Sequence, residues 1–282
     1  MEIKKVGVVG CGLMGSGIAQ TCAKAGYQTA VNEATQPLLD KGRERITKSL
    51  DKAVEKGKAT SEQMQKILDN LSFTHQLSDL KDCDLIIEAI IENMDEKKKL
   101  WKSLDKITRP EAIFASNTSS LSIVEMASVT SRVPRVVGMH FFNPVPIMKL
   151  VEMVKPITVA EDVFVTARKF AESLGKTIIV AKDTPGFIVN LLLIPYLLDA
   201  IRALERGIGS REDIDTAMTL GCGHPMGPLT LTDFIGADTT YYIAEAMYQE
   251  FKDPRYAPPP LLKSMVIAGF HGRKSGKGFY TY

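Results

Sequence analysis

The sequence has little cysteine, no long hydrophobic run and almost no excess of either charge. Its four cysteines show neither the paired spacing of a disulfide framework nor a cluster with histidine that would bind zinc. The most apolar stretch, residues 188–201, is interrupted by Asn190, Pro195 and Asp199 and is too short to span a bilayer. A formal net charge of +2 gives no electrostatic reason to expect nucleic acid or a membrane surface as a partner.

What remains is the composition of a globular protein, 45% apolar and 24% charged over 282 residues. That length suffices for one large domain or two of ordinary size. No secretory leader is expected, because the fold is expected to begin at Ile3. Together with the cysteine usage, this favours a cytoplasmic location.

Short β-like runs alternate with helical patterns over the first two thirds of the chain. Strands are expected at residues 6–9, 27–31, 84–89, 112–115, 135–140, 150–154 and 177–180. Helices are expected at residues 13–25, 36–58, 61–68, 95–107, 122–127 and 162–174. This alternation predicts an α/β fold with a Rossmann-like, doubly wound and mostly parallel sheet. The short connection at residues 143–146 predicts that its flanking strands form an antiparallel hairpin at the far edge of that sheet.

The β signal ends at Asp183, and the rest of the chain is predicted to be helical. Thr184 and Pro185 are expected to be the N-cap and first residue of an apolar helix that ends near Gly207. Ser210 is expected to cap the next helix. Further helical segments are predicted at residues 229–251 and 260–268.

The first predicted strand runs into a glycine-rich turn that opens a helix. The turn consists of Gly10, Cys11, Gly12, Leu13, Met14 and Gly15. Gly10 permits the tight turn, Gly12 lets a pyrophosphate approach the backbone, and Gly15 lets the helix pack closely on the strand. The helix N-terminus offers N–H groups and a partial positive charge to phosphates. The order of strand, turn and helix therefore predicts a dinucleotide site rather than a turn that binds nothing.

An acidic residue, Glu33, follows the second predicted strand, 18 residues beyond Gly15. A carboxylate at this point can accept hydrogen bonds from the adenosine ribose. It would also repel the 2′-phosphate of NADP, so NAD is the predicted cofactor. The chain is then expected to divide into an NAD-binding domain, residues 1–184, and an all-helical domain, residues 185–282.

Two polar residues, Ser119 and His140, lie at the carboxyl ends of predicted strands, where doubly wound sheets bind their ligands. Glu152 is the one carboxylate in the strand after His140, and the predicted hairpin could place the two side by side. A carboxylate bonded to one imidazole nitrogen leaves the other to act as a base. The spacing alone equally allows a structural histidine with Glu152 on a solvated strand face.

Several longer motifs resemble the L-3-hydroxyacyl-CoA dehydrogenase family over essentially the whole chain. They are residues 116–121 (SNTSSL), 140–146 (HFFNPVP), 149–152 (KLVE), 183–190 (DTPGFIVN), 223–229 (GHPMGPL) and 276–280 (GKGFY). The resemblance, which is greatest to bacterial members acting on 3-hydroxybutyryl-CoA, implies an NAD-dependent enzyme. Such an enzyme interconverts (S)-3-hydroxyacyl-CoA and 3-oxoacyl-CoA, here 3-hydroxybutyryl-CoA and acetoacetyl-CoA. It also implies a helical domain that serves substrate closure and dimerisation. The apolar helix after Pro185 agrees with an interdomain or subunit interface, so a homodimer is expected.

The resemblance implies catalytic roles for four residues. His140 would be the general base and Glu152 its orienting partner, while Ser119 and Asn190 would hold the 3-oxygen of the substrate. Ser119 would also reach the nicotinamide. Without the family, Ser119 reads as a turn hydroxyl and Asn190 as an amide inside a helix.

Further positions match binding residues of the family. The matching cofactor contacts are Glu92, Lys97, Asn143 and Lys274, and the matching CoA contacts are Ser49 and Lys56. Taken alone, Glu92 and Lys97 read as an exposed pair at the start of a helix. The charges around Ser49 and Lys56 likewise suit a solvated amphipathic helix.

Two other functions are compatible with a dinucleotide fingerprint. One is a 3-hydroxyacid dehydrogenase that uses a catalytic lysine and a substrate without CoA. The other is a non-catalytic NAD-binding protein, which would be expected to have lost the histidine or the glutamate. Activity on free 3-hydroxybutyrate compared with its CoA thioester distinguishes the first of these from the CoA-dependent enzyme.

Overall fold

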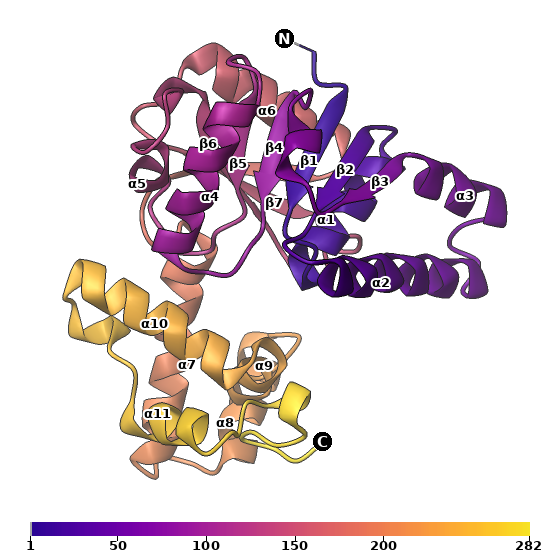
Figure 1. The fold of residues 1–282 in the computed structure, drawn as a ribbon. Coiled ribbons are helices and arrows are strands. Elements are labelled where there is room, and N and C mark those ends of the chain that lie inside the picture. The colour runs from indigo at the N-terminus through magenta and orange to yellow at the C-terminus, as the bar shows by residue number, and fades with distance from the viewer. Residues whose placement is uncertain (1) are drawn as a thin grey trace. The chain divides into compact units, whose positions relative to one another are not determined.

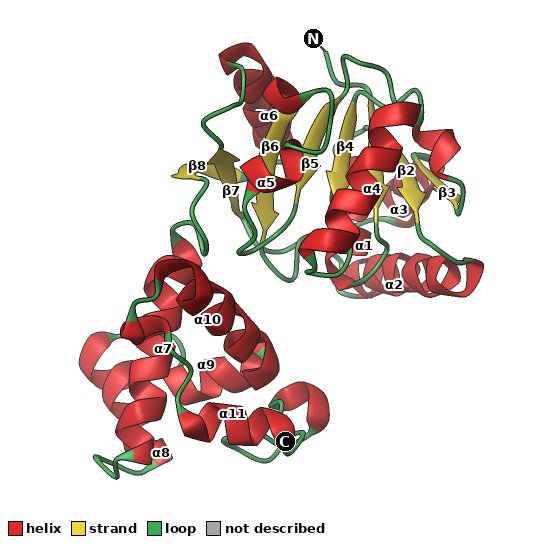
Figure 2. Ribbon diagram, turned by 60° about the vertical axis from the view of Figure 1, so that its left-hand side comes forward, coloured by secondary structure: helices red, strands yellow, loops and turns green. Residues whose placement is uncertain are grey.

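The computed structural model describes residues 2–282, and the chain divides into two compact units, Met1–Thr184 and Pro185–Tyr282. The first unit is a sheet with helices on both faces, and the second is built from helices (Figures 1 and 2).

Across residues 2–282, eight strands form one sheet in the order β3-β2-β1-β4-β5-β6-β7-β8. The strands are β1 (Lys5–Val9), β2 (Gln28–Asn32), β3 (Leu71–Thr74), β4 (Leu85–Glu88), β5 (Ile113–Ser116), β6 (Val136–Phe141), β7 (Leu150–Lys155) and β8 (Thr177–Lys182). Neighbouring strands pair in parallel, except that β6 and β7 pair antiparallel. The predicted doubly wound, mostly parallel sheet is confirmed.

Six α-helices cover the two faces of this sheet. They are α1 (Leu13–Lys24), α2 (Gln36–Glu55), α3 (Ser61–Asp69), α4 (Met94–Ile107), α5 (Ile123–Ala127) and α6 (Glu161–Ser173), with short 3₁₀ turns at η1 (Leu77–Leu80) and η2 (Val133–Arg135). Apolar residues of α1, α2, α3 and α6 share one core with the sheet. The other face is covered by α4 and α5 (Figure 2). On that face Trp101 packs edge-on against Phe114, with ring centroids 5.6 Å apart.

The sheet differs from the sequence prediction at its two edges. The edge strand β3 was not predicted, because its four residues are half-buried or exposed and include Ser72 and Thr74. The predicted hairpin of β6 and β7 forms, but it is not the edge of the sheet. Strand β8 pairs in parallel with β7 and lies outside it.

The second unit has the helical content that the sequence predicts. Its elements are α7 (Val189–Glu205), α8 (Arg211–Thr216), the π-helical turn η3 (Ala217–Gly221), α9 (Pro228–Ile235), α10 (Ala237–Phe251), η4 (Pro254–Tyr256), α11 (Pro260–Ile267) and η5 (Arg273–Ser275). A core that includes Leu198, Leu229, Met247 and Phe279 holds them together. The predicted cap at Ser210 is present, since its side chain accepts a hydrogen bond from the Asp213 N–H at 3.1 Å.

Two predicted helix boundaries in this unit were wrong. Helix α7 begins at Val189 instead of Pro185, because Gly186 (φ 81°) and Phe187 (φ 50°) adopt left-handed backbone conformations that a helix cannot include. The helix predicted over residues 229–251 is two helices, α9 and α10, which Gly236 separates.

Within residues 2–282, every helix is either too short or too polar to cross a membrane.

Candidate active site

The glycine-rich turn between β1 and α1 has the shape that a pyrophosphate requires. Gly10 has a φ of +93°, and a Cβ on Gly15 would overlap the carbonyl oxygen of Gly10. At Gly12, the space that a Cβ would occupy has no atom within 4 Å. Helix α1 begins directly after Gly12, which has no side chain to cap the N–H groups of the first turn. These residues therefore fit a dinucleotide whose phosphates meet the helix N-terminus.

Glu33 is fixed beside this turn at the carboxyl end of β2. Its carboxylate accepts hydrogen bonds from the backbone N–H groups of Cys11 and Ala34, both at 2.8 Å. The backbone carbonyl oxygen of Cys11 in turn accepts a hydrogen bond from the Arg45 guanidinium at 3.1 Å. The acidic group thus lies at the end of the second strand, where the adenosine ribose of a dinucleotide is expected.

His140 and Glu152 lie directly opposite each other in the antiparallel pair of β6 and β7. Their side chains are joined by a hydrogen bond of 2.7 Å between Nδ1 and Oε2. The Glu152 side chain is fully buried and that of His140 is 8% exposed. The alternative in which Glu152 lies on a solvated strand face was therefore wrong.

At the carboxyl-terminal ends of β4, β5 and β6, three polar side chains lie on the same face of the sheet. Glu88 and Ser116 are the last residues of β4 and β5. Glu88 accepts hydrogen bonds from Ser116 and from Lys97 of α4 on this side of the sheet. A Cβ on Gly138 would meet Ile123 of α5, and His140 is two residues further along β6, so it points to the same face. Polar groups are therefore gathered under α4 and α5 at the carboxyl ends of the parallel strands.

Lys97 is the centre of a buried charge cluster at this place. Its side chain is 1% exposed, with Nζ 2.6 Å from Glu88 Oε1 and 3.2 Å from Glu92 Oε2. The interpretation of Glu92 and Lys97 as an exposed pair at a helix start was wrong for Lys97, which the packing of α4 on the sheet buries, whereas the side chain of Glu92 is 38% exposed. Glu88 was not among the predicted site residues. Its signal in the sequence is a single carboxylate at the end of an otherwise apolar strand, Leu85–Glu88.

Glu92 holds the loop that follows β5. Its Oε1 accepts hydrogen bonds from Thr118 Oγ1 at 2.6 Å, from the Ser119 N–H at 2.9 Å and from Ser119 Oγ at 3.2 Å. Burial raises the pKa of Glu92, but the nearby Lys97 charge and these hydrogen bonds outweigh it and leave the pKa below its usual value. Glu92 is therefore an anion at neutral pH, and its charge orients the Ser119 hydroxyl.

The same loop is tied to the strand that carries the histidine. Asn117 Oδ1 accepts a hydrogen bond from the Phe141 N–H at 2.9 Å, next to His140. Ser119, which is half-buried, and His140, which is buried, are thus linked within the first unit through the loop that follows β5.

The other predicted residues lie in other parts of the chain. Asn143 is exposed in the connection after β6, and Ser49 and Lys56 lie near the C-terminal end of α2. Asn190 and Lys274 belong to the second unit. There Asn190 is buried near the start of α7, and Lys274 forms an ion pair of 2.6 Å with Asp238.

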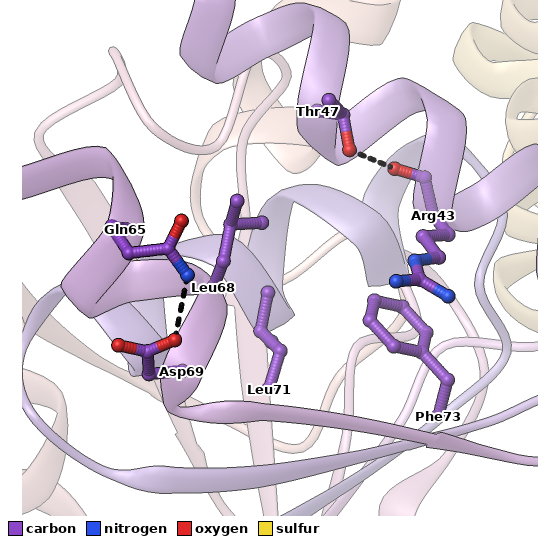
Figure 3. Close-up of a pocket in the computed structure, with 7 residues that line it drawn as sticks. All are labelled: Arg43, Thr47, Gln65, Leu68, Asp69, Leu71 and Phe73. Atoms are coloured by element: carbon purple, nitrogen blue, oxygen red, sulfur yellow. Dashed lines mark hydrogen bonds between the residues drawn. The ribbon is translucent and has the colours of Figure 1, made fainter. Parts of the chain in front are cut away.

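A hollow of about 550 Å³ opens between α2, α3 and β3 (Figure 3). It is lined by Arg43, Thr47, Gln65, Leu68, Asp69, Leu71 and Phe73. The Arg43 guanidinium covers the ring of Phe73 at 5.5 Å from the ring centroid. Ser49 lies about 200° around the helix from Thr47, so the hollow and the predicted CoA contacts are on different flanks of α2.

Two family models together match almost the whole chain. The model described as “3-hydroxyacyl-CoA dehydrogenase, NAD binding domain” matches residues 5–184, and “3-hydroxyacyl-CoA dehydrogenase, C-terminal domain” matches residues 186–282. The chain is 49% identical to the 3-hydroxybutyryl-CoA dehydrogenase of Mycobacterium tuberculosis in an alignment 282 residues long that covers 99% of each protein. It is 45% identical to the probable 3-hydroxybutyryl-CoA dehydrogenase of Bacillus subtilis, over 100% of this chain and 98% of that protein. The crystal structure of (S)-3-hydroxybutyryl-CoA dehydrogenase from Ralstonia eutropha superposes with a TM-score of 0.95 at 43% identity, over 100% of this chain and 99% of that one.

Proposed function

The chain belongs to the 3-hydroxyacyl-CoA dehydrogenase family and is an NAD-dependent oxidoreductase, and we propose that its substrate pair is (S)-3-hydroxybutyryl-CoA and acetoacetyl-CoA. Support for the four-carbon substrate comes from relatives of nearly equal length that carry this name. The functions without CoA or without catalysis are set aside, because both halves of the chain match this one family.

The observation that carries the proposed mechanism is the buried bond between His140 and Glu152. Oxidation of a secondary alcohol by hydride loss requires the hydroxyl proton to leave. Glu152 holds Nδ1 of His140, so the proton is taken up at Nε2. The carboxylate then stabilises the imidazolium that forms. In the direction of reduction, the imidazolium returns its proton to the 3-oxygen.

Ser119 and Asn190 are proposed to hydrogen-bond that oxygen as its charge changes during the reaction. In support, the Ser119 hydroxyl lies in the loop after β5, at the end of the sheet that also carries His140. For Asn190 the support is the family resemblance of residues 183–190 alone.

NAD, when bound, supplies the hydride acceptor. The turn at residues 10–15 is proposed to bind its pyrophosphate, and Glu33 the adenosine ribose. Glu92, Lys97, Asn143 and Lys274 are retained as proposed contacts toward the nicotinamide half. The burial of Lys97 favours an indirect role for that residue, developed below.

The CoA moiety is assigned to Ser49 and Lys56 on α2, where an ammonium group suits a phosphate. Dimerisation is assigned to residues 185–282. In its support, Leu192 on α7 is 70% exposed, and Ile208 and Leu220 are 77% and 82% exposed. A monomeric mass in sedimentation at micromolar concentration would contradict the homodimer. A cytoplasmic location is also proposed.

The function is tested by following NADH oxidation with acetoacetyl-CoA. Parallel assays use free acetoacetate, longer 3-oxoacyl-CoA thioesters and NADPH in place of NADH. We expect turnover with acetoacetyl-CoA and NADH, and a large loss with free acetoacetate or with NADPH. Equal rates on the free acid would contradict the role of CoA. Faster turnover of a long-chain thioester would contradict the four-carbon substrate.

A further inference from the structure

We propose that Glu88, through the buried Lys97 and through Ser116, is a positioning residue for Ser119, an inference that rests on the proposed role of Ser119 in the reaction. Glu88 does not need to touch substrate or cofactor for this. It lies at the end of β4 with its side chain 1% exposed and acts through the groups around it.

The carboxylate of Glu88 is fully engaged by hydrogen-bond donors. Oε1 accepts from Lys97 Nζ at 2.6 Å and from the Ile90 N–H at 2.8 Å, and Oε2 accepts from Ser116 Oγ at 2.7 Å. A buried carboxylate held by this many donors has one orientation. Glu88 is therefore a fixed point in the framework of the site.

Glu88 is linked to Ser119 first through ion pairs. Lys97 bridges Glu88 and Glu92, with its ammonium 3.2 Å from Glu92 Oε2. The other oxygen of Glu92 binds both the N–H and the hydroxyl of Ser119. Removing the charge of Glu88 would leave Glu92 as the one carboxylate that the structure places at Lys97. The ammonium group of Lys97 would then move toward Glu92 and disturb the hydrogen bonds that Glu92 accepts from Ser119.

A second route passes through the backbone of the loop. Ser116 donates its hydroxyl proton to Glu88 and accepts a hydrogen bond from the Thr118 N–H at 3.2 Å. Thr118 Oγ1 in turn accepts from the Ser120 and Leu121 N–H groups at 3.3 and 2.9 Å. Both routes converge on the residues that flank Ser119, so loss of Glu88 loosens the loop from two sides.

The chain offers a control on α4, the helix that carries Lys97. Near the C-terminal end of α4, Asp105 is paired with the buried Arg132 at 2.6 Å. Arg132 bonds the carbonyl groups of Arg109 and Ala112, which precede β5 at the opposite end of that strand. Asp105→Asn therefore removes a 13% exposed carboxylate that is also paired with a buried cation. Among the hydrogen bonds that the structure describes, Asp105 has none to the Ser119 loop.

The experiment is a double-mutant cycle with the full-length enzyme. Glu88→Gln, Ser119→Ala and the double variant are assayed for kcat and KM with NADH and acetoacetyl-CoA, and melting temperatures identify the range where each is folded. We expect Glu88→Gln to lower kcat about tenfold in the parent but less than about twofold when Ser119 is already alanine. Asp105→Asn should have the same small effect in both backgrounds. Equal losses from Glu88→Gln in both backgrounds would overturn the proposal.

A second measurement does not depend on turnover. Hydrogen–deuterium exchange of the free protein should show faster exchange of the amides of residues 118–121 in Glu88→Gln than in the parent or in Asp105→Asn. Unchanged exchange there, with Glu88→Gln folded, would overturn the positioning role. If exchange accelerates while the parent protein has no activity on acetoacetyl-CoA, the proposed function fails and the structural coupling stands.

Discussion

Replacing Glu152 by glutamine removes the charge beside His140 with almost no change of shape. The parent side chain is fully buried, and its Oε2 lies 2.7 Å from Nδ1 of His140. Glutamine can still accept a hydrogen bond from the ring. It provides no negative charge, and its amide N–H₂ group can instead hold the wrong tautomer of the histidine.

The expected loss of kcat follows from the attraction between the Glu152 carboxylate and the His140 imidazolium. Two unit charges about 4 Å apart attract by about 4 kcal/mol at an effective dielectric constant of about 20. The imidazolium exists only after the proton has moved, so this attraction acts on the transition state more than on the neutral ground state. Since each 1.4 kcal/mol is about a factor of ten in rate, the upper bound is about a thousandfold. We expect kcat to fall by about 10²–10³, within the usual range of general acid–base catalysis.

The assay follows NADH absorbance during reduction of acetoacetyl-CoA over a range of pH, with NADH affinity measured separately by fluorescence. Glu161→Gln is the matched control. Glu161 is 70% exposed and pairs with Lys155 at the end of β7, so the same substitution there should leave kcat unchanged. A Glu152→Gln enzyme with kcat within about threefold of the parent and the same pH–rate profile would refute the orienting role of the carboxylate.

Three further substitutions test other parts of the account. His140→Gln should lower kcat at least about 10²-fold while NADH affinity, measured by fluorescence titration, stays unchanged; near-normal turnover would eliminate His140 as the base. Ser49→Ala combined with Lys56→Ala should raise KM for acetoacetyl-CoA several-fold without changing KM for NADH, because a phosphate contact is lost; equal KM values would remove α2 from CoA binding. Asp105→Asn tests stability against pH. Burial raises the pKa of Asp105, but its hydrogen bonds from Ser131 and Arg132 outweigh this and lower it. The ionised carboxylate of Asp105 therefore stabilises the folded state fully above about pH 4. This contribution is lost as the pH falls through the lowered pKa of Asp105. Urea unfolding should show a smaller difference between parent and variant at about pH 3 than at pH 7, and a constant difference would contradict that assignment.

The sequence predicts the sheet well where the strands are central. Strands such as Val6–Val9 and Leu85–Glu88 are buried on both faces, and buried strands are rich in consecutive apolar residues. Strand β3 is a short edge strand with half-exposed side chains, so its residues carry no such signal. The start of α7 was misplaced because Thr184 and Pro185 form a good local helix start, which the left-handed conformations at Gly186 and Phe187 override.

For the candidate site, local sequence indicates position along a strand but not burial. The short connection after His140 made its pairing with Glu152 a reasonable expectation, because hairpin register follows from loop length. Lys97 could not be recognised as buried from its polar surroundings, Asp95 to Lys99. Its burial depends on how α4 packs against β4 and β5, which are distant in sequence. The connection from Glu88 to Ser119 is of the same kind.

The central claim is that one imidazole, held by one buried carboxylate, exchanges the proton of the substrate oxygen. A crystal structure of the enzyme with NAD and acetoacetyl-CoA measures this directly. The account predicts Nε2 of His140 within hydrogen-bond distance of the 3-oxygen, with Nδ1 still bonded to Glu152. A 3-oxygen held by other groups, with the imidazole turned away from it, would contradict the account.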